Sequence, residues 1–192
     1  RKQGVREGEI PEVVIDYCFL GAEGEEETIA IQVAMDKKTR MHFAHVVPRK
    51  GLTHEHGSDE MIKDLEKLGH KEVLLKCDGE PALRSVQEDV KRKREEKTLI
   101  ENSPVEDSKA NGSAERAVQT VTEQVRVMRH ALEQRLNMKI SGKHPVMTWL
   151  VEHVSDVITK YLQSSDGKTG YQRLFGKQVH EDAFEFGEKV MY

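Results

Sequence analysis

The order of strand-like and helix-like segments restricts the fold of this chain more than any other feature. Three apolar runs come first, and their short polar links predict an antiparallel meander: residues 11–20, 28–36 and 40–47. Helical and strand-like spacing then alternate through residues 55–68, 73–77, 81–90 and 98–100. This order predicts an α/β fold whose mixed sheet combines a three-strand antiparallel meander with two parallel strands and is flanked by helices.

The second half of the chain has mainly helical periodicity. A polar segment with Pro and Gly at 101–112 is expected to form a mobile loop. Apolar residues then recur every three or four positions: Val118, Val121, Val125, Met128, Leu132 and Leu136. Another helix is expected from about 145 to 162, with Trp149 in the core. Residues 1–10 are interpreted as a linker, and 166–192 as an extension that starts a further module.

Composition restricts the possible functions in three ways. The chain has 192 residues, enough for one ordinary domain with a core, and no apolar run approaches the roughly 18 residues of a membrane span. Its net charge of −4 means that any nucleic-acid-binding surface must be local, because phosphate contacts supply much of the affinity. Strand alternation places Cys18 and Cys77 on opposite faces, so both are expected to be reduced, as in an intracellular protein.

Three carboxylates occupy positions that this fold could bring together. Asp16 closes the first apolar run, Asp78 follows the strand that ends at Cys77, and Glu115 opens the long helix. If the first strand lies next to the fourth, Asp16 and Asp78 become neighbours near the carboxyl ends of strands. Glu115, three residues before Val118, is expected to be directed at the sheet instead of solvent. Taken singly, each residue is more typical of a turn or a helix start.

Together these acids predict a metal site. Converging carboxylates repel one another unless cations neutralise them, and hard oxygen ligands suit Mg²⁺ or Mn²⁺. Two ions about 3.5–4 Å apart could activate the attacking oxygen and stabilise the leaving oxygen in a phosphodiester displacement.

The spacing and context of the three acids resemble a known signature. There are 61 residues between Asp16 and Asp78, and 36 between Asp78 and Glu115. The stretches Val13-Val14-Ile15-Asp16, Lys76-Cys77-Asp78-Gly79-Glu80 and Asn111-Gly112-Ser113-Ala114-Glu115-Arg116 are similar to the catalytic core of retroviral and retrotransposon integrases, which has the ribonuclease H-like fold. The last stretch most resembles copia-type elements, and Thr169–Gly176 looks like the segment that follows such cores. The similarity covers roughly residues 10–192, with the catalytic core at 11–165.

The resemblance implies a polynucleotidyl transferase of the DDE type, excised from a Pol polyprotein, that trims the 3′ ends of element DNA and joins them to target DNA. Asp16, Asp78 and Glu115 would be the catalytic residues and the ligands of two Mg²⁺ or Mn²⁺ ions. The expected partners are double-stranded DNA, as element ends and target, and further copies of the chain in a homo-oligomer, with no membrane. The expected location is the nucleus or a cytoplasmic virus-like particle.

DNA contacts are predicted at Lys109, Asn111 and Arg116, beside the presumed metals. One departure from the family concerns the same helix. Where retroviral relatives offer lysines to DNA, this chain has Gln119 and Thr122.

Two rival functions stay open. One is a ribonuclease H or resolvase on the same fold, which the Asn-Gly-x-Ala-Glu context of Glu115 disfavours. The other is a decayed or domesticated copy that binds DNA or protein without catalysis. Weaker signals have ordinary explanations: Asp36 is expected to form a turn, His54 and His56 to be surface residues, and the basic run 91–94 to be a solvated helix end.

Overall fold

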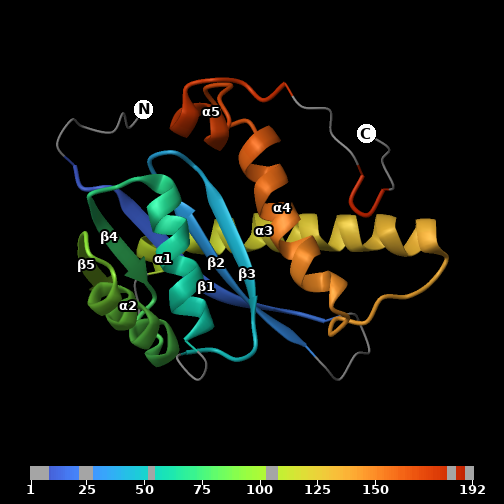
Figure 1. Cartoon of the computed structure of the whole chain (residues 1–192), viewed down its shortest axis with the longest axis horizontal. Helices are drawn as coiled ribbons and strands as arrows, with labels where there is room; N and C mark the ends of the chain where they lie inside the picture. The colour runs from blue at the N-terminus through green and yellow to red at the C-terminus, as the bar shows by residue number, and fades with distance from the viewer. Residues whose placement is uncertain (1–8, 22–27, 52–54, 103–107, 181–184, 189–192) are drawn as a thin grey trace.

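The computed structural model describes residues 9–21, 28–51, 55–102, 108–180 and 185–188, and the side chains of 108–111 are outside that description (Figure 1). Five strands form one sheet in the order β3-β2-β1-β4-β5. Their bounds are β1 Glu12–Leu20, β2 Ile29–Asp36, β3 His42–Val47, β4 Glu72–Cys77 and β5 Lys97–Asn102. The first three strands pair antiparallel, whereas β1 with β4 and β4 with β5 pair parallel. This arrangement confirms the predicted fold class.

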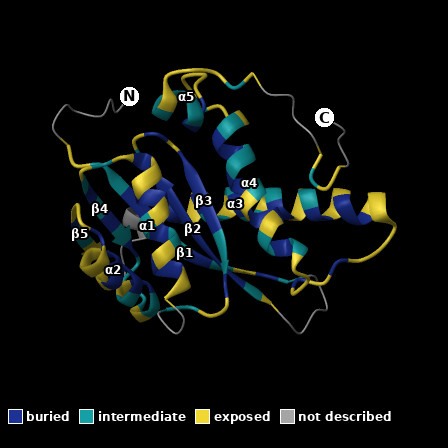
Figure 2. Ribbon diagram, in the orientation of Figure 1, coloured by how far each residue is buried: buried dark blue, intermediate teal, exposed yellow. Residues whose placement is uncertain are grey.

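Helices cover both faces of the sheet (Figure 1). Their bounds are α1 His56–Leu68, α2 Pro81–Lys93, α3 Ser108–Leu136, α4 Val146–Tyr161 and α5 Gly170–Phe175. Helices α1 and α2 pack on one face, while α3 crosses the other against β1 and β2 and is joined there by α4. Burial follows this layering, since the strands and the inward helix faces are buried and the outward helix faces are exposed (Figure 2).

Strand β1 is buried on both faces because it lies at the centre of the sheet. Its alternate residues enter two separate hydrophobic clusters. Val13 and Tyr17 pack toward α1 and α2, whereas Val14 and Leu20 pack toward α3 and α4. Cys18 packs with the second cluster and Cys77 with the first, and both are free thiols, which confirms their predicted placement on opposite faces.

Two expectations for the helices were wrong. Helix α3 begins at Ser108, so residues 108–112 are helical and do not belong to a loop, while 103–107 lie outside the described residues. Trp149 is 72% exposed and is not in the core. The reason is its position on α4, which packs through Leu150, Val154 and Ile158 and leaves Trp149 beside that buried stripe.

The turn between β2 and β3 is built on Asp36, which confirms the predicted turn role. This side chain is fully buried, and its Oδ2 accepts hydrogen bonds from the Thr39 amide at 3.0 Å and the Thr39 hydroxyl at 2.6 Å. Helix α5 packs on the same turn, because Gly170 comes so close that a Cβ would lie 2.9 Å from the Arg40 carbonyl oxygen. Whether residues 166–192 start a further module stays a prediction.

The surface histidine expected at His56 is confirmed as exposed, and His54 lies outside the described residues. Within the described ranges, the structure contains no helix whose length and apolar character suit a bilayer crossing.

Candidate active site

The parallel pairing of β1 with β4 places two of the predicted acids side by side. The register pairs Glu12 with Leu74 and Val14 with Lys76, a constant offset of 62 residues. The pairing ends two residues before Asp16, and Asp78 is the residue after β4; the same offset relates the two aspartates, and the charge of Asp78 acts on Asp16. Because strand residues alternate between faces, both aspartates belong to the sheet face that carries α3. The sequence prediction that Asp16 and Asp78 become neighbours is therefore confirmed.

Asp78 is held by the turn that leads from β4 into α2. Gly79 has φ of 84°, a conformation that glycine adopts without steric cost. The turn brings the Glu80 amide to the Asp78 Oδ1, to which it donates a hydrogen bond of 2.9 Å. Pro81 then begins α2 at its first turn, where its missing N–H is not needed. The aspartate thus lies at the carboxyl end of β4 in a defined position.

The charge of Asp16 is disfavoured by its surroundings. Burial is the largest cause and raises the pKa of Asp16 from 3.8 to about 6. Repulsion by Asp78 and Glu80 raises the pKa further, while the Tyr17 amide, which donates to Oδ1 at 2.7 Å, and the Lys50 ammonium lower it. A half-buried carboxylate beside a second one favours either a proton or a cation. The donor set of this pair fits a hard divalent cation such as Mg²⁺.

Glu115 does not join the pair in this structure. Its side chain is exposed, contrary to the prediction that it is directed at the sheet. The reason is the rotation of α3, whose first turns bury Ala114 and Ala117 and leave Glu115 to one side of that line. Among the residues that the structure describes, no group of three or more His, Cys, Asp or Glu side chains is arranged to hold a metal ion.

Glu115 nevertheless lies on the edge of α3 that borders β1. Thr122 follows it by seven residues, which is nearly two full turns, so both side chains occupy the same row of the helix. The Thr122 hydroxyl lies 3.7 Å from the Cys18 Sγ, and Cys18 shares its face of β1 with Asp16. The row of α3 side chains that contains Glu115 therefore lies next to the face of β1 that carries Asp16.

The predicted DNA contacts are only partly described. Arg116 is exposed on α3 next to Glu115. Lys109 and Asn111 belong to the start of α3, but their side chains lie outside the described part of the chain. Gln119, at one of the positions where relatives offer a lysine, donates its amide to Glu123 at 2.9 Å.

Sequence reasoning missed two residues beside the pair. The Lys50 Nζ lies 2.8 Å from each carboxylate oxygen of Glu80 and contacts the rings of Tyr17 and Phe19, at 5.4 and 5.0 Å from their centroids. Glu80 is part of the motif around Asp78, so its closeness to the acidic pair could have been inferred from the sequence. Lys50 arrives from the segment after β3 and has no signal in the sequence.

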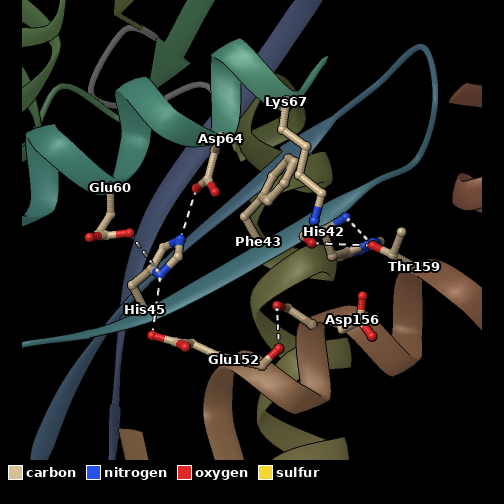
Figure 3. Close-up of a pocket in the computed structure, with 10 residues that line it drawn as sticks. His42, Phe43, His45, Glu60, Asp64, Lys67, Glu152, Asp156 and Thr159 are labelled. Carbon is tan, nitrogen blue, oxygen red and sulfur yellow. Dashed lines mark hydrogen bonds and ion pairs between the residues drawn. The ribbon is translucent and has the colours of Figure 1, made fainter. Parts of the chain in front are cut away.

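A second polar site lies elsewhere, between β3, α1 and α4 (Figure 3). It is a cavity of about 210 Å³ in which His45 faces three carboxylates. The His45 Nε2 is 2.9 Å from Asp64, and its Nδ1 is 3.9 Å from both Glu60 and Glu152. Burial lowers the pKa of His45, but the bond to Asp64 and the three negative charges outweigh it and raise the pKa above 6.5. The His45 ring thus links β3, α1 and α4, which is a structural role.

No protein-family model matches the chain, and no curated protein matches it. Solved structures do. The integrase catalytic core domain of BIV matches with a TM-score of 0.52 and 13% identity, over 86% of this chain and 93% of that one. The HTLV-2 integrase catalytic core domain in complex with magnesium matches with a TM-score of 0.59 and 12% identity, over 88% of this chain and 99% of that one.

A third match is a chain of the simian T-cell lymphotropic virus intasome in complex with the PP2A regulatory subunit B56 gamma. Its TM-score is 0.64 at 13% identity, over 98% of this chain but only 63% of that chain. The three matches establish the fold: this chain has the ribonuclease H-like architecture of retroviral integrase catalytic cores.

Proposed function

We propose that this chain is an integrase catalytic core of the retrotransposon type, a metal-dependent polynucleotidyl transferase that acts on double-stranded DNA ends. The observation that carries the proposal is the closeness of Asp16, on β1, to Asp78, the residue that follows the adjacent parallel strand β4, in a fold shared with retroviral integrase cores. The retrotransposon assignment rests on the stretch from Asn111 to Arg116 and is a proposal from sequence.

Asp16 and Asp78 would hold the divalent ions, and Glu115 would complete the site by turning its exposed side chain across the edge of α3. Bound Mg²⁺ or Mn²⁺ supplies activation of the attacking oxygen and stabilisation of the leaving one. The protein residues prepare this chemistry. Burial disfavours the unneutralised charge of Asp16, and the Tyr17 amide fixes the direction of its carboxylate. Arg116, exposed beside Glu115, would contact a DNA phosphate.

Nicking of a labelled DNA duplex in Mn²⁺ tests the proposal. We expect the wild type to nick the duplex and Asp78→Asn to lose the activity. Asp156→Asn is the matched control, since this aspartate pairs with Lys160 on α4, away from the acidic pair. Nicking that persists unchanged in Asp78→Asn would come from a contaminating nuclease and would contradict the proposal.

A metal-binding measurement separates ion binding from catalysis. An ion that binds the folded protein stabilises it by mass action, so Mn²⁺ should raise the unfolding temperature of the wild type. The same addition should leave Asp16→Asn unchanged. Equal stabilisation of both proteins would place the ion elsewhere.

One observation favours a second function, that of a domesticated domain which binds DNA without cutting it. Glu115 is exposed, and the three acids are not gathered among the described residues. This function predicts duplex binding with no metal-dependent nicking, and no effect of Glu115→Gln on any measured property. A ribonuclease H would instead prefer an RNA–DNA hybrid over duplex DNA, which the same assay detects with a hybrid substrate.

A further inference from the structure

Lys50 is held at the same end of the sheet as the acidic pair, over the face of β1 that carries Tyr17 and opposite the face that carries Asp16. Its ammonium is 2.8 Å from both oxygens of Glu80 and lies over the rings of Tyr17 and Phe19. The side chain keeps 27% of its surface exposed, and that of Glu80 keeps 31%. The ion pair between Lys50 and Glu80 is therefore partly buried, and solvent reaches both side chains.

The segment that carries Lys50 is anchored to the core of the sheet. The amide of the next residue, Gly51, donates to the Tyr17 hydroxyl at 3.2 Å. Tyr17 is 7% exposed, and its hydroxyl in turn donates to Gln32 at 3.4 Å. Gln32 is almost wholly buried and donates to the Gly57 carbonyl at 3.0 Å. These contacts fix Lys50 relative to β1, so its position is a property of the fold.

The Lys50 ammonium lies over two residues of β1, Tyr17 and Phe19, that follow the pairing of this strand with β4. Strand β1 continues to Leu20, whereas its pairing with β4 ends at Val14 and Lys76. Beyond that point β1 has no ladder partner on its β4 side within the described part of the chain, and Phe19 is 53% exposed. Asp16 lies at the beginning of this stretch, and the charges of Lys50 and Glu80 both act on it.

We propose that Lys50 is a DNA-positioning residue that exchanges its Glu80 partner for a backbone phosphate next to the phosphodiester held at Asp16 and Asp78. The inference rests on the integrase function proposed above. An ammonium is a compact cation suited to phosphate, and this one lies over two aromatic rings. In a protein of net charge −4, Lys50 supplies positive charge that acts on Asp16, whose carboxylate repels DNA. Glu80 competes with the phosphate for the ammonium and so weakens DNA binding.

A purely structural ion pair predicts a different pattern of mutant effects. If the pair only fastens the segment after β3 to α2, loss of either partner has the same consequence, because each loss breaks the same contact. If Lys50 binds phosphate, the two losses have opposite effects. Lys50→Met removes the cation and weakens DNA binding, whereas Glu80→Gln frees the cation, removes a negative charge and tightens binding.

Binding of a labelled duplex, measured by fluorescence anisotropy between 50 and 200 mM salt, tests this difference. We expect Lys50→Met to weaken binding about threefold or more at the higher salt and to reduce the slope of log affinity against log salt by about 0.9, the value for one phosphate contact. Lys50→Arg should keep both values near those of the wild type. In the nicking assay, Lys50→Met should raise KM and leave kcat within about twofold.

Lys97→Met is the matched control. Lys97 also pairs with a carboxylate, Glu72 at 2.6 Å, but at the opposite end of β4 from Asp78. It should leave DNA binding, salt slope and KM unchanged. Unfolding temperatures of all four variants establish that each protein is folded.

The outcomes separate the two proposals. A wild type that nicks DNA, together with a Lys50→Met protein of unchanged KM and salt slope, overturns the role of Lys50 and leaves the integrase function standing. Equal weakening by Lys50→Met and Glu80→Gln also overturns it. Binding without nicking, with opposite effects of the two substitutions, supports the phosphate contact and contradicts the enzyme. A wild type that neither binds nor nicks overturns both.

Discussion

Replacing Asp16 by asparagine should stabilise the protein at neutral pH in the absence of divalent ions. The substitution keeps the shape of the side chain and the acceptor for the Tyr17 amide, which donates to Oδ1 at 2.7 Å. It removes only the charge that burial and the neighbouring Asp78 disfavour. Most substitutions of a half-buried polar residue destabilise a protein, so a gain in stability would be specific to this cause.

The pKa shift sets the magnitude and the sign. The pKa of Asp16 rises from 3.8 to about 6, and each unit corresponds to about 1.4 kcal/mol, so the upper limit is about 3 kcal/mol. Because the side chain is only partly buried, solvent screening reduces the expected gain to about 1–2 kcal/mol. Between about pH 4 and pH 6 the folded protein holds a proton that the unfolded chain has released. The stability of the wild type therefore falls over this interval and stays lower above it.

Urea unfolding followed by circular dichroism, with EDTA present, measures the effect. We expect Asp16→Asn to have the higher midpoint at pH 7.5 and the same midpoint as the wild type near pH 4. Asp78→Asn removes one repulsive charge but leaves Asp16 buried, so it should retain most of the pH dependence, since burial is the largest cause. A midpoint for Asp16→Asn that is equal to or below that of the wild type at pH 7.5 would refute the electrostatic reasoning.

Three further predictions follow from single residues. His45→Gln should destabilise the protein more at pH 6 than at pH 8.5. The pKa of His45 is raised in the folded protein, so its stabilising effect is present below the unfolded pKa of 6.5 and is lost as pH rises through the folded pKa. An equal drop in unfolding temperature at both pH values would contradict this. Asp36→Asn should lower the free energy of unfolding, measured in urea, by about 2–3 kcal/mol, because Asp36 is fully buried and accepts hydrogen bonds from Thr39 and His70. A decrease below about 0.5 kcal/mol would show that these hydrogen bonds contribute little. Glu115→Gln should change stability by less than about 0.5 kcal/mol, since the side chain is exposed, yet abolish nicking; retained nicking would exclude Glu115 from catalysis.

The fold could be predicted because its determinants are local and periodic. Alternation along β1 specified two buried faces, and glycine at position 69 suits the left-handed conformation, with φ of 68°, in which α1 ends. The pairing of Asp16 with Asp78 followed from the same logic. Once β1 lies beside β4, the two-residue period of a strand determines which side chains share a face.

What the sequence could not supply is the rotation of one element against another. The stripe of α3 predicted which face is buried, but Glu115 lies at its margin, where a small rotation separates a sheet-facing side chain from an exposed one. Trp149 shows the same limit on α4, one position from the buried Leu150. Lys50 reaches Glu80 across 30 positions of sequence, through a segment with no periodicity from which that contact could be inferred.

Asp36 and Asp16 are both aspartates in a buried sheet, but a structural role explains the burial of only one of them. Both follow apolar residues in neighbouring strands, and the sequence alone gave both a turn-forming alternative. Burial acts to raise the pKa of each, but in Asp36 hydrogen bonds from His70 and Thr39 outweigh it and lower the pKa. Asp16 receives one amide donor and faces like charges, so its pKa stays raised. The turn explains the burial of Asp36, whereas the unfavourable charge of Asp16 has no such partner among the described residues and would be neutralised by the divalent cation that we propose it shares with Asp78.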